Sequence, residues 1–210
     1  VSTLQITSGS ITSSTGTITV TSGGTPTFDL QGGTVSAILA GTGVAATKSG
    51  GGLVVLSGAN TYTGLTTVNG GTLQLGRNDA LLTTGSITVA GGTFDLSTYS
   101  QTTNVLKLLG GSISGTGALN ASSYSLESGS IGIALTGAAV PVNKSTNGTV
   151  VLSGANTYGG GTTVTAGTLA LGLASSLPAT GAVTVNGGTL ALSTFNNAVG
   201  AVTITAGSIT

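Results

Sequence analysis

Cysteine, histidine, methionine and tryptophan are all absent from this 210-residue sequence. Without cysteine the chain has no disulfide framework and no thiolate ligand for a metal. Without histidine or cysteine it lacks the common nucleophile–base pairs and the usual zinc ligands. The sequence therefore predicts no catalytic residue, no metal site and no cofactor site of these kinds.

Charge is also scarce, since only 4% of the residues are charged and four basic residues balance four acidic ones. An ordinary globular domain has roughly 25% charged residues. A nucleic-acid partner requires a basic face, so this composition argues against one. No apolar run approaches the ~18–20 residues of a membrane-spanning helix. A neutral surface of this kind favours close lateral packing, because net charge normally keeps molecules apart.

Apolar residues alternate with polar ones along much of the chain, with a period of two. Ile18-Thr19-Val20, Ile87-Thr88-Val89 and Val183-Thr184-Val185 are examples, and β-branched residues dominate them. Such alternation is typical of a half-buried strand. No window has the 3.6-residue period of a helix, so the sequence predicts an all-β protein.

Glycine corners separate the alternating stretches at nearly regular intervals along the chain. Two rounds of such corners repeat after 96 residues. Because a corner recurs about every 19 residues, the sequence indicates a solenoid, in which each coil stacks on the one before it. The spacing predicts about eleven coils, with Val, Ile, Leu and Phe inside and Thr and Ser in outward ladders. The corner glycines are Gly33, Gly52, Gly71, Gly92, Gly111, Gly129, Gly148, Gly167, Gly188 and Gly207.

One stretch is repeated almost unchanged: residues 53–76 return as residues 149–172. Both copies contain Leu-Ser-Gly-Ala-Asn-Thr-Tyr, then Thr-Thr-Val, Gly-Thr-Leu and Leu-Gly. This string resembles the passenger-associated transport repeat of bacterial autotransporters. The resemblance covers about a quarter of the chain, and the motif is fairly specific to these surface proteins.

The resemblance implies a right-handed parallel β-helix on the outside of a Gram-negative cell. Passengers of this kind are often adhesins, biofilm proteins or self-associating stalks, so we expect an extracellular structural or adhesive role and no enzyme. The implied partners are other copies of the chain, end to end or side by side, and host-surface or matrix glycans. The resemblance also implies an outer-membrane translocator in another part of the protein. We expect residues 1–210 to be one continuous segment of a longer array or filament.

Some segments depart from the regular pattern. We expect residues 76–82, 97–104 and 136–148 to form the third side of the coil and its loops. The super-repeat extends back to Phe28 but slips by five or six residues between Thr21 and Thr27. Pro26 marks this irregularity, because proline cannot donate to a strand ladder.

The acidic residues are the only candidates for catalysis. Asp29 and Asp95 each lie in a Phe-Asp-Leu triplet, where alternation directs them outward, about three coils or ~14 Å apart. Glycosidases need two carboxylates closer than that, across one bond. We therefore interpret both as solvated ladder positions. For Arg77-Asn78-Asp79 we expect a loop tip with a surface ion pair.

Asn60 and Asn156 and the tyrosines that follow them, Tyr62 and Tyr158, are the candidates for ligand contacts. Asparagine tolerates left-handed backbone and bonds its own turn, so a structural role is the stronger interpretation. The tyrosines either stack on a sugar or cover a corner of the coil, and we favour the corner.

Two alternative functions remain open. The threonines of residues 15–21 resemble a flat ladder that binds ice or another crystal surface, although most coils carry other residues at the equivalent site. A polysaccharide-acting β-helix enzyme would require Asp29, Asp79, Asp95 or Glu127 for catalysis, and the shortage of paired acids makes it the weakest alternative.

Overall fold

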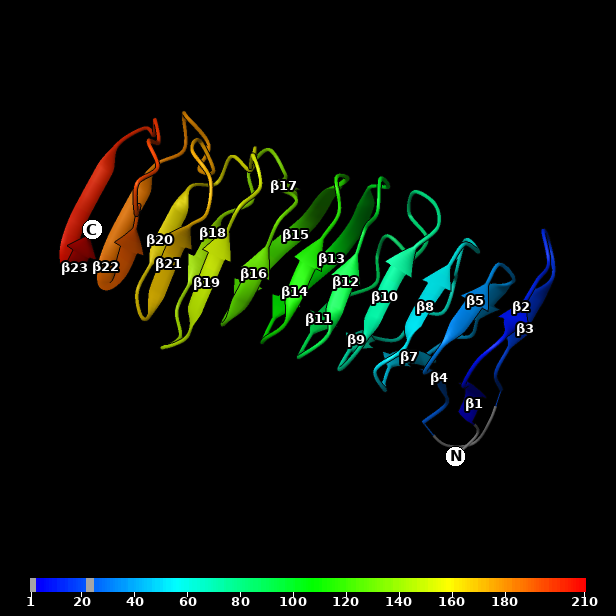
Figure 1. The fold of residues 1–210 in the computed structure, drawn as a ribbon. Helices are drawn as coiled ribbons and strands as arrows, with labels where there is room; N and C mark the ends of the chain where they lie inside the picture. The colour runs from blue at the N-terminus through cyan, green and yellow to red at the C-terminus, as the bar shows by residue number, and fades with distance from the viewer. Residues whose placement is uncertain (1–2, 22–24) are drawn as a thin grey trace.

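The computed structural model describes residues 3–21 and 25–210. Its strands stack in successive coils along one axis, with the two termini at opposite ends of the rod (Figure 1). Every recorded strand pair is parallel, and the described residues contain no helix, hence none able to cross a membrane. The predicted all-β parallel solenoid is thus confirmed.

The first face of the rod is a column of strands whose members pair in register from one end to the other. Ten steps connect its eleven strands, which agrees with the predicted coil number. These strands are β1 (Thr3–Ile6), β4 (Thr27–Leu30), β7 (Ala45–Lys48), β9 (Thr66–Val68), β11 (Ile87–Val89), β13 (Gln101–Leu108), β15 (Ala118–Leu126), β18 (Val142–Lys144), β20 (Thr162–Val164), β22 (Val183–Ala191) and β23 (Val202–Ile209).

The second face follows the glycine corner. Its last two rungs are the C-terminal halves of β22 and β23, which continue around the corner without a break. The earlier rungs are β2 (Ser10–Ile11), β5 (Gly33–Val35), β8 (Leu53–Leu56), β10 (Thr72–Leu75), β12 (Thr93–Asp95), β14 (Ser112–Ser114), β16 (Gly129–Ile131), β19 (Thr149–Leu152) and β21 (Thr168–Leu171).

The third side is only partly paired. It contains β3 (Thr17–Thr19), β6 (Ile38–Ala40), β17 (Ala134–Thr136) and the N-terminal parts of β13 and β15. The expectation that residues 97–104 and 136–148 form the third side and its loops is confirmed for residues 101–103, which pair with residues 119–121 on that side, and for the loop at residues 137–141. It is wrong for residues 142–144, because β18 belongs to the first face.

The first step of the column is the longest. Leu4 pairs with Phe28, whereas the next partner of Phe28 is already Ala46, and every later step is likewise shorter than the first. This extra length agrees with the slip predicted before Phe28. Pro26 lies directly before β4 and accepts a bond from the Ala45 amide through its carbonyl, at 3.1 Å. Residues 22–24, which belong to the same prediction, lie outside the described residues.

The interior is a mainly apolar column. Leu30, Val68, Val89 and Leu108 occupy equivalent inward positions and have no exposed surface. Burying each such side chain contributes about 1.5–3 kcal/mol. The alternating side chains face solvent, and hydroxyl pairs such as Thr93–Ser112, at 2.9 Å, form the predicted ladders.

Most corner glycines lie one above another between the first and second faces, but Gly33 and Gly129 pair with Val54 and Val150, so Gly52 and Gly148 are offset from them by two residues. A Cβ added to Gly33 would lie 2.1 Å from the Gly9 carbonyl oxygen, and one on Gly111 would lie 2.1 Å from that of Gly92. Both residues also have positive φ, +109° and +76°. Coils approach so closely here that a side chain has no room, which is why glycine recurs at this position.

Glycine is also required on the third side, where it can be tested without positive φ. A Cβ on Gly154 would lie 1.8 Å from the Ile133 carbonyl oxygen, whereas one on Gly51 would have no neighbour within 4 Å. We expect Gly154→Ala to lower the free energy of unfolding by about 1–3 kcal/mol, because the main chain must shift. Gly51→Ala should change it by less than about 1 kcal/mol. Urea unfolding of both variants tests this, and equal effects would contradict the close packing of coils.

Candidate functional site

Asp29 projects outward from β4 and is held by hydrogen bonds. Its carboxylate accepts bonds from the Ser49 hydroxyl at 2.5 Å and from the side-chain amides of Gln5 and Gln31 at 2.8 Å each. The Ser49 hydroxyl, and then the two amides, lower the pKa of this carboxyl against the opposing effect of burial. A carboxylate with its acceptor sites occupied and a lowered pKa is a poor proton donor.

Asp95 projects outward from β12, where it accepts bonds from the Gln74 side chain at 2.7 Å and the Ser97 amide at 2.8 Å. The prediction that both aspartates face outward is confirmed. Asp29 lies on the first face, however, and Asp95 on the second. Identical triplets enter different faces because the corner falls at a different distance from each.

The loop at Arg77–Asp79 is held by main-chain bonds. Asp79 accepts a bond from the Thr102 amide at 2.7 Å, and the Arg77 side chain donates to the Asn78 carbonyl at 3.2 Å. The predicted ion pair in this loop is wrong, because the carboxylate is used to fasten the next coil. The ion pair recorded in the described residues joins Lys107 and Glu127, 3.2 Å apart, on the first face.

Two lysines lie inside the rod, which the sequence analysis missed. Lys48 and Lys144 occupy inward positions of the first-face column and have no exposed surface. The Lys48 ammonium donates to the carbonyl oxygens of Ser49, Gly50 and Gly70, at 2.5, 3.0 and 3.1 Å. The Lys144 ammonium, 96 positions later, donates to the Thr146 carbonyl and hydroxyl and to the Ala166 carbonyl.

Each lysine therefore ties the corner of its own coil to the corner of the next. Burial is the main influence on these groups and lowers the pKa of both lysines from the ordinary value of 10.5. Asp29 opposes the change at Lys48, and Glu127 opposes it at Lys144. The exact 96-residue recurrence of a lysine within an apolar column was the signal in the sequence that could have revealed this role.

Asn60 and Asn156 are structural, and Asn60 donates to the Gly58 carbonyl of its own turn at 3.2 Å as predicted, but the left-handed backbone was not found and their other bonds join coils. Both are buried, 3% and 4% exposed, and neither has positive φ. The Asn60 side chain accepts a bond from the Leu39 amide of the coil before it and donates to the Ala80 carbonyl of the coil after it, each at 2.8 Å. Asn156 bonds the Leu135 amide and the Ser176 carbonyl in the same manner. These amides replace strand pairing on the side of the rod that has little of it.

Tyr62 and Tyr158 lie inside the rod rather than over a corner. They are 2% and 0% exposed, and their hydroxyls bond those of Thr66 and Thr162, at 2.7 Å in both cases. Burial raises the pKa of both phenols, that of Tyr158 to about 12. Stacking on a sugar would require an exposed ring, so this interpretation is wrong for both.

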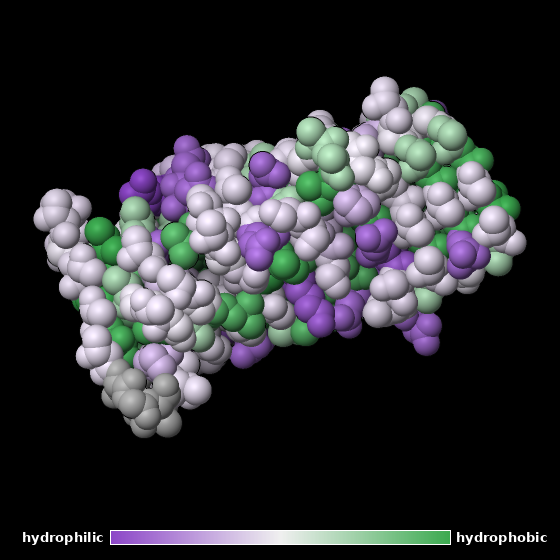
Figure 2. All heavy atoms as spheres, turned by 180° about the vertical axis from the view of Figure 1, so that it is seen from behind, coloured by the Kyte–Doolittle hydropathy of each residue, from purple (hydrophilic) through white to green (hydrophobic). Residues whose placement is uncertain are grey.

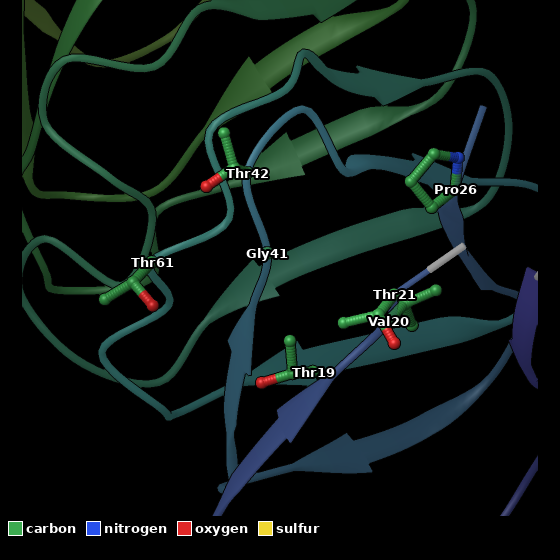
Figure 3. A pocket seen from close by; sticks show the side chains of 7 residues that line it. All are labelled: Thr19, Val20, Thr21, Pro26, Gly41, Thr42 and Thr61. Carbon is green, nitrogen blue, oxygen red and sulfur yellow. The ribbon is translucent and has the colours of Figure 1, made fainter. Parts of the chain in front are cut away.

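A hollow of about 560 Å³ lies where the first long coil meets the next one. It is lined by Thr19, Val20, Thr21, Pro26, Gly41, Thr42 and Thr61 (Figure 3). None of these side chains is charged or aromatic. Elsewhere in the described residues no three potential metal ligands come together. The back of the rod is mostly pale, with scattered hydrophilic and hydrophobic spots, as expected for a wall rich in Thr, Ser and Gly (Figure 2).

These features define a class: a parallel β-solenoid whose polar groups mainly join its own coils. The passenger-associated-transport-repeat family matches residues 47–75, 143–171 and 173–192. The chain is 37% identical over 164 residues to a protein named Adhesin BmaC autotransporter, from Brucella suis biovar 1 (strain 1330). That match covers 74% of the chain but 4% of the relative's length. No solved structure matches the chain.

The chain thus carries the passenger-associated transport repeat and is similar to an autotransporter adhesin. The motif found in the sequence agrees with the family match, which adds a third copy at residues 173–192. Asn197, which follows that copy, bonds the Leu177 amide at 3.1 Å, as Asn60 and Asn156 bond theirs.

The asparagine contacts can be tested directly. We expect Asn60→Ala to lower the free energy of unfolding by about 1–3 kcal/mol, because the buried Leu39 amide loses its partner. The exposed Asn143 of β18 is a matched control, and Asn143→Ala should change stability by less than about 0.5 kcal/mol. Urea unfolding compares the two, and an unaffected Asn60→Ala variant would contradict the proposed contact between coils.

The buried lysines and tyrosines predict a maximum in stability near pH 10. Because the pKa of Lys48 and Lys144 is lowered in the folded state, the folded chain releases these protons first, so stability rises as the pH approaches 10.5. The raised pKa of Tyr62 and Tyr158 acts in the opposite direction, and stability falls above pH 10.0. Urea unfolding between about pH 7 and 11 measures both effects.

Substitution separates these two contributions. The double variant Lys48→Met and Lys144→Met should lose the rise below pH 10 whatever its overall stability. The surface variant Lys107→Met should keep it. A rise that persists in the double variant would show that other groups cause it.

Proposed function

We propose that this chain is a non-enzymatic adhesive rod on the outer surface of a Gram-negative cell. One observation carries the proposal: the buried polar side chains join coils to one another. Asn60, Asn156 and Lys48 are all engaged in this way. A wall assembled like this holds its shape without a cofactor and leaves hydroxyl ladders facing outward.

The similarity to a protein named as an adhesin supports the adhesive role, and the passenger repeats support export to the cell surface. As the chain spans 4% of that relative, the activity of a whole protein of this type remains a proposal. We also propose that the whole protein has an outer-membrane translocator in another part of its chain.

We propose host-surface or matrix glycans as targets and self-association as a second role, which suits a stalk in a biofilm. Outward hydroxyls and amides can exchange hydrogen bonds with sugar hydroxyls without any pocket. The wall also carries little charge to oppose contact between neighbouring rods. Lys107 and Glu127, two of its charged groups, neutralise each other.

Binding to ice or another crystal surface is the alternative, and one observation favours it. Thr47, Thr67 and Thr88 stand in register on the first face. The ladder is short, because Lys107 occupies the next rung. Residues 17–19 of the threonine stretch noted in the sequence pair with Ile38–Ala40, so they add no long array. Thermal hysteresis is the measurement that distinguishes this function from adhesion.

Beads coated with the chain should adhere to matrix glycans in proportion to the folded chain on them. A variant with Asp29→Asn, Asp79→Asn, Asp95→Asn and Glu127→Gln tests for catalysis, and we expect its adhesion to persist in proportion to the folded fraction. Incubation of the wild-type chain with polysaccharides should release no new chain ends. Release at an enzyme's rate, abolished in the variant, would overturn the non-enzymatic proposal, and failure of the folded chain to adhere would overturn the adhesive one.

A further inference from the structure

We infer that the hollow at Thr19, Thr42 and Thr61 binds one neutral sugar residue of a glycan. This inference rests on the glycan-binding part of the proposed function and gives that function a defined site. Three observations support it: the position of the hollow on the rod, the chemistry of its lining, and the difference between this corner and the equivalent corner 96 residues later.

The hollow lies on the side of the rod, because three successive coils contribute to it. β3, which ends at Thr19, pairs with β6 of the next coil. In the coil after that, the Thr61 amide donates to the Leu39 carbonyl of β6 at 2.8 Å. In Figure 3 the backbone at Gly41 passes between Thr61 and Thr21, so residues of the first and third coils face the same space.

The lining can form hydrogen bonds but carries no charge. Its four threonines, Thr19, Thr21, Thr42 and Thr61, are exposed, and each hydroxyl can both donate and accept. Within the described residues, no hydrogen bond to another protein group engages any of these four hydroxyls. A ligand can therefore bond to them without breaking a contact that holds the wall together.

These properties favour a neutral ligand that is rich in hydroxyl groups. A charged ligand would lose water in the hollow and meet no opposite charge in the lining, which is unfavourable. A sugar ring has hydroxyls for the threonines and C–H groups for Val20 and Pro26, the apolar side chains of the lining. The volume of about 560 Å³ is typical of small-molecule sites, which span roughly 300–1,000 Å³.

The equivalent corner of the second repeat is spanned by a strand instead. There β15 runs unbroken through residues 118–126, whereas in the first repeat β3 ends at Thr19 and β4 begins only at Thr27. Ala138 also stands where the first repeat has Thr42, so the second corner lacks that hydroxyl. The two repeats therefore differ at this corner, and the second supplies a control for the first.

A titration followed by nuclear magnetic resonance tests the site in the folded chain. The probes are the methyl glycosides of glucose, galactose, mannose and N-acetylglucosamine. We expect at least one of them to shift the amide signals of Thr42 and Thr61 in a saturable way, and to leave that of Thr157, 96 residues after Thr61, unchanged. The charged sugar N-acetylneuraminic acid should bind at least about tenfold more weakly. No saturable shift with any of the four probes, or equal binding of the charged sugar, would overturn the inference.

A matched pair of substitutions tests the hydroxyl contacts. Thr61→Val replaces a hydroxyl by a methyl group, and Thr157→Val makes the same change at the equivalent exposed position, whose amide bonds the Leu135 carbonyl at 2.9 Å. We expect Thr61→Val to weaken binding of the sugar about three- to tenfold, because a sugar hydroxyl loses its partner, and Thr157→Val to leave it unchanged. Adding Thr42→Val to Thr61→Val should weaken it further. Equal affinities of the Thr61→Val and Thr157→Val chains would overturn the inference.

These outcomes are separable from failure of the proposed function. If no sugar binds in the hollow but coated beads still adhere to matrix glycans, the adhesive role stands without this site. If a sugar saturates the hollow but the folded chain on beads adheres to nothing, the site stands and the adhesive role falls.

Discussion

Parallel pairing of each coil with the next is the interaction on which the whole structure depends. The chain contacts itself mainly between successive coils, so a coil gains its hydrogen bonds and its apolar neighbours from the coils on either side. Such a structure has no centre, and its stability accumulates from one interface to the next. Features that bring coils closer together therefore matter more than any single residue in the interior.

Three devices maintain the close approach, two at the corner between the first two faces and one on the third side. Stacked glycines allow backbones to meet at the corner between the first two faces, as Gly111 does over Gly92. Asn60 and Asn156 bridge three coils on the third side, where strand pairing is sparse. The ammonium groups of Lys48 and Lys144 donate hydrogen bonds to corner carbonyls that would otherwise lie unbonded next to the core. The conspicuous polar residues of the repeat are thus used within the wall.

The same reasoning accounts for the few charged residues on the surface. A rod that presents repeated hydroxyls and hardly any charge can approach a sugar-rich layer, or another rod, without first displacing counterions.

The sequence by itself determined the coil, because a residue type that recurs at a fixed step must occupy a fixed place in a winding chain. Gly33 and Gly111 could be assigned to one corner for this reason, and the outward direction of Asp29 and Asp95 followed from alternation. Only the tertiary structure decided which face each aspartate occupies, and that Lys48, Asn60 and Tyr62 point inward. Their environment depends on carbonyls and amides in the neighbouring coils, which no local pattern encodes. Periodicity reports where a residue lies in the coil, whereas its partners are set by the coils above and below it.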